Sequence, residues 1–156
     1  MKKVFIGIDF SKLKFDAAIY SVDTKAIVAT EVFDNEQSGY VDFLQWLKAT
    51  TRCQKSGMLF CGEHTGYYSG NLSVFLYESG YDMWLVSGLE IKLTQGIKRT
   101  KTDRVDACKI AEHAYRYQDK VVLFQPVCKS LDEIRELLSY RERLVETRKM
   151  LTTSDK

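Results

Sequence analysis

The order of apolar segments in the first ninety residues limits the folds open to this chain. Three β-rich stretches come first, joined by the short links SKL and DTK, at residues 3–10, 14–22 and 26–35. Short links between successive strands are typical of an antiparallel meander. Helix-like and strand-like segments then alternate, at 36–51, 57–63, 67–80 and 81–87. This order predicts an α/β fold with a mixed sheet and helices on both faces.

The ribonuclease H-like fold has this order of elements, with five strands in one mixed sheet. Tyr40, Phe43, Leu44 and Leu47 repeat at helical spacing, and Gly80 marks the end of the second helix. A chain of 156 residues with 45% hydrophobic and 28% charged residues can form one domain with its own core.

The four cysteines form no C-x-x-C pair, which disfavours a zinc site and indicates free thiols in a reducing compartment. No apolar stretch is long enough to span a membrane. We therefore expect a cytoplasmic protein without a membrane partner.

Four acidic residues stand where the predicted elements begin or end. Asp9 ends the first strand and Glu63 ends the fourth, while Asp103 and Asp106 open a helix that begins near Thr102. The i, i+3 spacing puts the last two acids on one helix face. If the first and fourth strands are neighbours, both strand-end carboxylates reach one edge of the sheet. Clustered carboxylates are tolerable when a divalent cation neutralises them, so the pattern predicts a magnesium site suited to phosphodiester chemistry.

Each acid also has an ordinary structural interpretation. An aspartate at a strand end often precedes a turn, and a glutamate in the first turn of a helix is favourable. Asp103 can cap its helix, with Asp106 as a capping-box-like partner. Spacing alone leaves both interpretations open.

A basic block precedes the last two acids. Between residues 92 and 104, one acid stands among five basic residues: Lys92, Lys98, Arg99, Lys101 and Arg104. Positive charge beside a carboxylate cluster suits a phosphate backbone that approaches bound metal, and a solvated loop is the alternative. Because the net charge is only +2, binding of nucleic acid must depend on this local charge.

The C-terminal segment has a different pattern. Leu137, Leu144 and Leu151 are seven residues apart in a region otherwise rich in charge. This predicts an amphipathic helix over residues 129–156, either packed on its own domain or forming a coiled-coil arm that makes a homo-oligomer. We expect a catalytic domain at residues 1–128 before it.

Three of these blocks together resemble the N-terminal domain of the DEDD transposases, insertion-sequence recombinases related to the Piv-type DNA invertases. The blocks are GIDFS with Asp9, EHTGYY with Glu63, and KTDRVDACKIA with Asp103 and Asp106. They come in the order of the family, over about residues 3–150. The third block is the most specific, whereas GIDxS alone is a weak signal.

The resemblance implies a RuvC-like domain that cleaves and transfers the DNA strands of a mobile element. It implies Mg²⁺, with Mn²⁺ as an alternative, held by Asp9, Glu63, Asp103 and Asp106. It also implies DNA as a partner and, in some members, an element-encoded guide RNA. A location in the cytoplasm of a prokaryote, in association with the nucleoid, is implied as well. Family members carry a second, C-terminal domain with a serine thought to attack DNA. The expectation is that this chain lacks that domain and does not complete catalysis alone.

Two other classes of protein remain open on the sequence. Actin-like sugar kinases begin with a similar GID hairpin, but they have a Gly-Thr phosphate turn after the aspartate, where this chain has Ser11 and Lys12 after Phe10. A non-catalytic module for nucleic-acid binding or dimerisation is the other alternative. Divalent-ion binding separates the module from the enzyme, and ATP binding identifies the kinase.

Overall fold

The computed structural model of the chain describes residues 2–95, 103–126 and 129–153. The chain forms two compact units, residues 1–124 and 125–156. In the described part of the chain, the first unit contains the sheet and four α-helices, and the second contains one α-helix. The predicted division at residues 128 and 129 stays a prediction.

One five-stranded sheet forms the centre of the first unit. Its spatial order is β3-β2-β1-β4-β5, with β1 in the middle. The pairs β1–β2 and β2–β3 are antiparallel, and the pairs β1–β4 and β4–β5 are parallel. The strands are β1 (Val4–Phe10), β2 (Lys14–Ser21), β3 (Ala26–Asp34), β4 (Met58–Glu63) and β5 (Met83–Val86). The predicted meander and the predicted mixed sheet are both confirmed.

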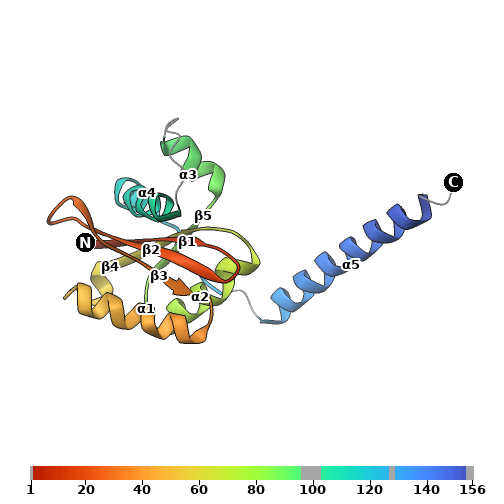
Figure 1. The fold of residues 1–156 in the computed structure, drawn as a ribbon, viewed down its shortest axis with the longest axis horizontal. Coiled ribbons are helices and arrows are strands. Elements are labelled where there is room, and N and C mark those ends of the chain that lie inside the picture. The colour runs from red at the N-terminus through yellow and green to blue at the C-terminus, as the bar shows by residue number, and fades with distance from the viewer. Residues whose placement is uncertain (1, 96–102, 127–128, 154–156) are drawn as a thin grey trace. The chain divides into compact units, whose positions relative to one another are not determined.

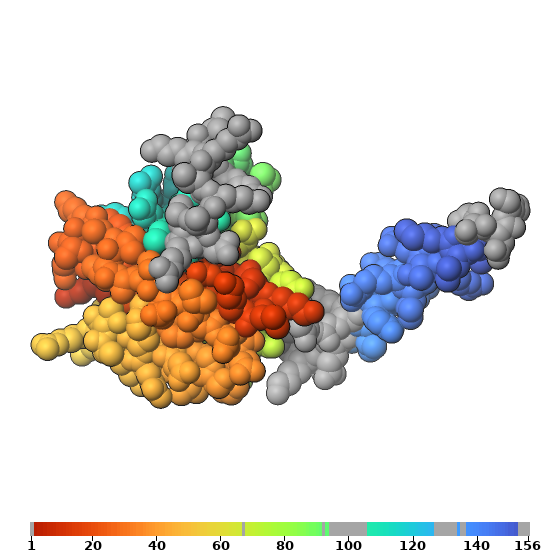
Figure 2. Space-filling view, in the orientation of Figure 1, coloured from red at the N-terminus to blue at the C-terminus, as the bar shows by residue number. Residues whose placement is uncertain are grey.

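Helices cover both faces of this sheet (Figure 1). One face carries α1 (Gln37–Thr50) and α2 (Tyr67–Glu78), and the other carries α3 (Gly88–Gln95) and α4 (Asp103–Arg116). Short 3₁₀ turns lie at Lys55–Gly57 and Gln118–Lys120. On the side of the unit seen in Figure 2, most of the surface comes from the first fifty residues, coloured red to orange.

Side chains of β1 alternate between the two faces, as the pleat of a strand requires. Ile6 and Ile8 belong to the core under α1 and α2, where the Phe43 ring lies 5.2 Å from that of Phe15 and 5.8 Å from that of Phe60. Phe5 belongs to the core under α4. Both faces of the central strand are therefore buried, which explains its nearly continuous apolar sequence.

Small residues bring α4 very close to β1. A Cβ added to Gly7 would lie 2.1 Å from the carbonyl oxygen of Ala107 and 2.4 Å from the amide nitrogen of Ala111. Ala107, Ala111 and Ala114 are all buried at this contact. The helix backbone thus rests directly on the strand, because neither surface carries a bulky side chain there.

Two features complete the comparison with the sequence. The short helix α3 was not predicted as a separate element, and its first turn is capped by Ser87, whose Oγ accepts a hydrogen bond from the Glu90 amide at 3.2 Å. The predicted C-terminal helix is present as α5 (Lys129–Thr153). In the part of the chain that is described, no helix is both long and apolar enough to cross a membrane.

Candidate active site

The two strand-end acids lie on neighbouring strands at one edge of the sheet. In the parallel pair β1–β4, Ile8 is opposite Gly62, so Asp9 and Glu63 come one residue later on each strand. Asp9 follows Gly7 by two residues, and Glu63 follows the buried Cys61 by two residues, so both acids share the sheet face that α4 covers. The sequence-based expectation that strands one and four are neighbours is confirmed.

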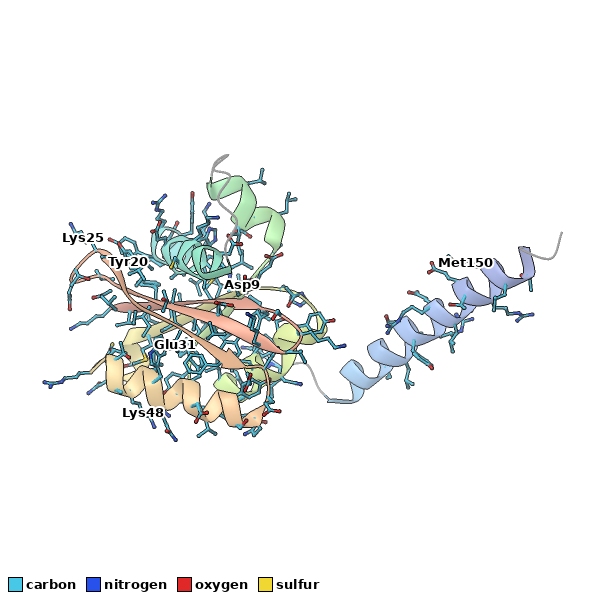
Figure 3. All side chains as sticks on the ribbon, viewed as in Figure 1. Asp9, Tyr20, Lys25, Glu31, Lys48 and Met150 are labelled. Atoms are coloured by element: carbon cyan, nitrogen blue, oxygen red, sulfur yellow. The ribbon has the colours of Figure 1, made fainter. Side chains whose placement is uncertain are left out.

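The start of α4 reaches the same edge. The ring of Tyr115 lies 5.5 Å from that of Phe5, and Ala107 and Ala111 lie over Gly7, so α4 runs antiparallel to β1. From Tyr115 back to Asp106 the helix rises about 13.5 Å. From Phe5 to Asp9 the strand rises about 13 Å. These two lengths bring Asp106 to the level of Asp9, as Figure 3 shows for Asp9 below the first turns of α4.

The carboxylate of Glu63 occupies space beside the first residue of α3. A Cβ added to Gly88 would lie 2.0 Å from Glu63 Oε1 and 2.6 Å from its Cδ. Glu63 is therefore packed against a position that carries no side chain. This contact could not be predicted from the sequence, because it joins a strand end to a helix that was not predicted.

Asp106 has a partner on its own helix. Lys109 Nζ donates a hydrogen bond to Asp106 Oδ1 at 2.8 Å, and the Asp106 side chain is 42% exposed. Asp103 is the first residue of α4, one turn before Ala107, and its side chain lies outside the described residues. Among the side chains that are described, no three from histidine, cysteine, aspartate and glutamate are grouped closely enough to hold a metal ion.

A further acid, Asp16, lies at the same place and was missed by the sequence analysis. In the antiparallel pair β1–β2 it stands directly opposite Asp9. Its neighbours at i+2 and i+4, Ala18 and Tyr20, belong to the core under α4, so Asp16 is on that face too. It is only 6% exposed. The available signal was an acid placed inside an apolar strand, in KFDAAIYS.

The side-chain amide of Asn35 connects the loops at this edge through hydrogen bonds. Asn35 Nδ2 donates hydrogen bonds to the carbonyl oxygens of Ser11 and Tyr68, at 2.9 and 3.0 Å. The Tyr40 hydroxyl donates to Asn35 Oδ1 at 2.8 Å. These bonds join the β1–β2 turn, the end of β3 and the start of α2, and so fix the backbone just beyond Asp9.

The predicted basic block cannot be placed against these acids. Lys98, Arg99 and Lys101 lie outside the described residues. Lys92 is in α3 and Arg104 is in α4, and neither side chain is among those described. In the sequence, the block connects α3, the helix beside Glu63, with α4, the helix that carries Asp106.

The two histidines do not belong to this group of acids. His113 is on the buried face of α4, with ring contacts to Trp84 and Tyr117 at 5.5 and 4.8 Å. Burial lowers the pKa of His113. Smaller effects come from Glu90, which raises this pKa, and from Lys120, which lowers it. His64 is exposed, and its amide donates to the Val86 carbonyl oxygen at 2.8 Å. His113 therefore belongs to the core.

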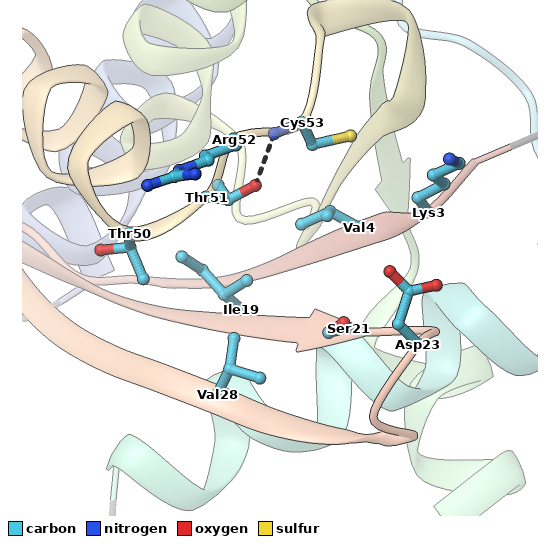
Figure 4. A pocket seen from close by; sticks show the side chains of 10 residues that line it. All are labelled: Lys3, Val4, Ile19, Ser21, Asp23, Val28, Thr50, Thr51, Arg52 and Cys53. Atoms are coloured by element: carbon cyan, nitrogen blue, oxygen red, sulfur yellow. Dashed lines mark hydrogen bonds between the residues drawn. The ribbon is translucent and has the colours of Figure 1, made fainter.

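A cavity of about 400 Å³ lies at the opposite edge of the sheet. Its lining includes Lys3, Asp23, Arg52 and Cys53, around the first residue of β1 (Figure 4). The Cys53 amide donates to Thr51 Oγ1 at 3.0 Å in its wall. Because Asp9 is near the other end of β1, this cavity is separate from the acidic edge, the end of the sheet that carries Asp9, Asp16 and Glu63.

The acidic edge has the donor chemistry of a magnesium site. Asp9, Glu63 and Asp106 offer carboxylate oxygens, which are the ligands that Mg²⁺ and Mn²⁺ prefer. They come from two adjacent strand ends and from a helix at the same level. Glu63 lies against Gly88, and Asp106 accepts a hydrogen bond from Lys109.

Comparison with protein families identifies one match over nearly the whole chain. Residues 6–154 match the model of the DEDD family of IS110 type, described as transposase. The pilin gene-inverting proteins of Moraxella lacunata and Moraxella bovis are each 30% identical over 145 residues. The matched part is 91% of this chain but 43% of each of those proteins, so the chain spans less than half of their length.

Solved structures show the same fold. Thermus thermophilus RuvC, in a complex with a Holliday junction substrate, aligns with a TM-score of 0.53 over 78% of this chain and 99% of its own. A second structure of that RuvC has a TM-score of 0.54 over 77% of this chain and 98% of its own. Sequence identity is 14% in both cases. The predicted ribonuclease H-like, RuvC-like fold is confirmed.

Proposed function

Because this chain belongs to the DEDD transposase family of IS110 type, we propose that it is the metal-binding domain of a recombinase that cleaves and transfers DNA strands of a mobile element. The observation that carries the proposal is the alignment of Asp9 with Glu63 on adjacent parallel strands, with Asp106 at the same level on α4. The matches described above are to recombination proteins and do not favour the kinase alternative.

We assign the divalent ion to Asp9, Glu63, Asp103 and Asp106. Asp9 is central, because it lies on the middle strand of the sheet, next to the strand of Glu63 and under the helix of Asp106. Bound Mg²⁺ or Mn²⁺ would polarise the phosphodiester and stabilise the oxygens that attack and leave. The protein carries these carboxylates on strands and a helix, which are rigid elements. Such elements can hold the ligands of an ion in the precise positions that a metal site requires.

Lys109 has a defined part in this proposal. Its ammonium group now neutralises Asp106 at 2.8 Å. With a divalent ion at Asp106, the Lys109 ammonium group would be able to bind a phosphate oxygen near the same helix turn. Gly88 contributes by leaving room for the Glu63 carboxylate. Activity of the whole recombinase, including DNA inversion or transposition and use of a guide RNA, remains part of the proposal.

The test is binding of DNA with and without a divalent ion. Labelled four-way junction and linear duplex are titrated with the protein in Ca²⁺ or in EDTA, and cleavage products are sought in Mg²⁺ and Mn²⁺. We expect tighter binding of the junction in Ca²⁺ than in EDTA, since metal would bridge carboxylates and phosphate. Equal affinity in both, with no cleavage product, would instead identify a metal-independent nucleic-acid-binding module.

The basic block gives a prediction of its own. Alanine at Lys98, Arg99 and Lys101 should weaken binding of DNA or RNA at low salt. The slope of log affinity against log salt should fall by roughly 0.9 for each lost phosphate contact. Fluorescence anisotropy at several salt concentrations measures both quantities.

A matched control removes three positive charges elsewhere, by alanine at Lys25, Lys48 and Arg52. All three are exposed, and Figure 3 shows Lys25 in the β2–β3 turn and Lys48 in α1, away from Asp9. If the control variant lowers the salt slope as much as the variant of the basic block does, binding depends on total charge and the block has no special role.

The C-terminal helix should make the protein a homo-oligomer. On α5, Leu137, Leu144 and Leu151 are 68%, 54% and 67% exposed. A surface helix with such a stripe is stabilised by burying it against another helix. We expect modest affinity, because Arg141 and Arg148 border the stripe. Sedimentation equilibrium should show a mass above the monomer, and glutamine at the three leucines should reduce it to that of the monomer. A monomeric wild type contradicts this prediction.

A further inference from the structure

An apolar residue is exposed on the turn between β1 and β2, at the same end of the sheet as Asp9. Leu13 is 77% exposed, the largest exposed fraction among the large hydrophobic residues that the structure describes. A single exposed leucine is ordinary on a protein surface. Leu13 differs in its neighbours, because Lys12 and Lys14 are also exposed and place a positive charge on each side of it in the sequence.

Hydrogen bonds fix the backbone of this turn. The amide and the Oγ of Ser11 both donate to the Lys14 carbonyl oxygen, at 2.9 and 2.7 Å. The Asn35 amide donates to the Leu13 carbonyl oxygen at 2.8 Å, and Asn35 Nδ2 donates to that of Ser11 at 2.9 Å. Asn35 Nδ2 also donates to the carbonyl oxygen of Tyr68, which is 39% exposed. The turn therefore carries Leu13 on a rigid support, next to the start of α2.

The turn lies within reach of DNA bound at the acidic edge. Leu13 follows Asp9 by four residues, which span at most about 13 Å along the chain. Successive nucleotides of one DNA strand are about 3.4 Å apart along the helix axis. Leu13 would thus meet a base within about four nucleotides of a phosphate at Asp9, and the two lysines would lie near the phosphates beside that base.

We propose that Leu13 is a wedge that enters between two stacked bases of the DNA, while Lys12 and Lys14 bind the adjoining phosphates. The inference rests on the proposed function, which places DNA at this edge. Leucine is among the apolar side chains that separate base steps in proteins that bend DNA. The two positive charges favour DNA over an apolar protein surface, because burying unpaired charges against such a surface would be costly.

The test compares Leu13→Ala with the wild-type chain on a four-way junction, at low salt in EDTA, so that no divalent ion takes part. 2-Aminopurine, a base that fluoresces more strongly when it is unstacked, is placed in turn at each position within about four nucleotides of the crossover. We expect the wild type to raise the fluorescence at one or more positions, and Leu13→Ala to lose most of that rise. Affinity should fall about tenfold, since the apolar surface that leucine buries between bases is lost.

Val122→Ala is the matched control, because Val122 is 76% exposed. Two residues later, the Phe124 amide donates to the Met83 carbonyl oxygen, at the start of β5. Glu63 is paired with Val86, at the other end of β5. Val122 is therefore remote from the acidic edge, and Val122→Ala should change neither the fluorescence nor the affinity. Because both side chains are exposed, neither substitution should move the midpoint of urea denaturation.

The lysines are tested by their effect on the salt dependence of binding. The double variant Lys12→Ala, Lys14→Ala should lower the slope of log affinity against log salt by roughly 1.8, or roughly 0.9 for each phosphate contact. Leu13→Ala should leave that slope unchanged, because leucine carries no charge. This difference separates the contribution of the wedge from that of the charges beside it.

Three results would overturn the proposal. Fluorescence and affinity equal to those of the wild type in Leu13→Ala would show that Leu13 does not enter the base stack. A lower mass of Leu13→Ala in sedimentation, with junction binding unchanged, would assign the turn to a contact between two copies of the chain. Weaker binding of a hairpin RNA, with junction binding unchanged, would assign it to RNA.

Failure of this inference is distinguishable from failure of the proposed function. If Leu13→Ala behaves as the wild type does, and the wild type binds the junction more tightly in Ca²⁺ than in EDTA, the proposed function stands and only the wedge is wrong. If the wild-type chain binds neither junction nor duplex with or without Ca²⁺, the proposed function is wrong and the wedge is wrong with it.

Discussion

Asp9→Asn should abolish most divalent-ion binding while leaving the fold intact. Asparagine has nearly the same shape as aspartate, so the packing of β1 under α4 is preserved. The lost charge belongs to the central carboxylate of the site, and even substitution of outer partners costs 10–100-fold in metal affinity. We expect a loss of about a hundredfold or more, together with loss of the Ca²⁺-dependent part of junction binding.

Thermal or chemical denaturation provides a second measurement of the same loss. At a free Mn²⁺ concentration of about 100 times the wild-type dissociation constant, the ion should add about 2.7 kcal/mol to the free energy of unfolding. A variant with hundredfold weaker affinity should gain only about 0.4 kcal/mol at that concentration. Glu63→Gln should also lose affinity. Retention of the full Mn²⁺ stabilisation by Asp9→Asn would rule out a metal site at this edge.

Gly7→Ala should be among the most destabilising single changes in the first unit. The new Cβ would lie 2.1 Å from the Ala107 carbonyl oxygen, 2.4 Å from the Ala111 amide nitrogen and 2.9 Å from the Ala111 Cβ. Two of these atoms are helix backbone, so the clash is relieved only by moving α4 off β1. Overpacking typically costs 1–3 kcal/mol, occasionally more. We expect about 3 kcal/mol or more in urea denaturation.

The same substitution at Gly70 is the matched control. Gly70 lies inside α2, and a Cβ added there meets no atom within 4 Å. Alanine is favoured over glycine in a helix by about 0.5–1 kcal/mol, so Gly70→Ala should stabilise the protein. Both variants add one methyl group, but Gly7→Ala should lower the free energy of unfolding and Gly70→Ala should raise it. Equal stability of Gly7→Ala and wild type would mean that α4 does not pack on β1 as described.

The fold was largely predictable because its strongest signals are local. Short links and period-two segments indicated the meander of β1–β3, and alternation of helix and strand indicated the parallel pairs with β4 and β5. The helix α3 was missed because eight residues carry little periodicity. Its cap was nevertheless visible, as Ser87 followed three residues later by Glu90.

The site was predictable only in part, for a different reason. Asp9 and Glu63 were found because each ends a strand, and their adjacency follows from the pairing of β1 with β4. Asp16 was missed because the importance of an acid within a strand depends on what lies opposite it, which the register decides. Gly88 was missed because its contact with Glu63 joins residues that are distant in sequence.

The packing of α4 on β1 also has a consequence for the order in which the contacts of the first unit can form. β1, β2 and β3 are consecutive and pair locally, whereas β4 joins β1 only after α1 has been made, and α4 comes last. Non-local contacts form after local ones because closing a long loop costs entropy. During synthesis, Gly7 and the side chains of β1 that face α4 thus stay uncovered by this helix until residues 103–116 have emerged. The contact between α4 and β1 is consequently among the last that the first unit can form.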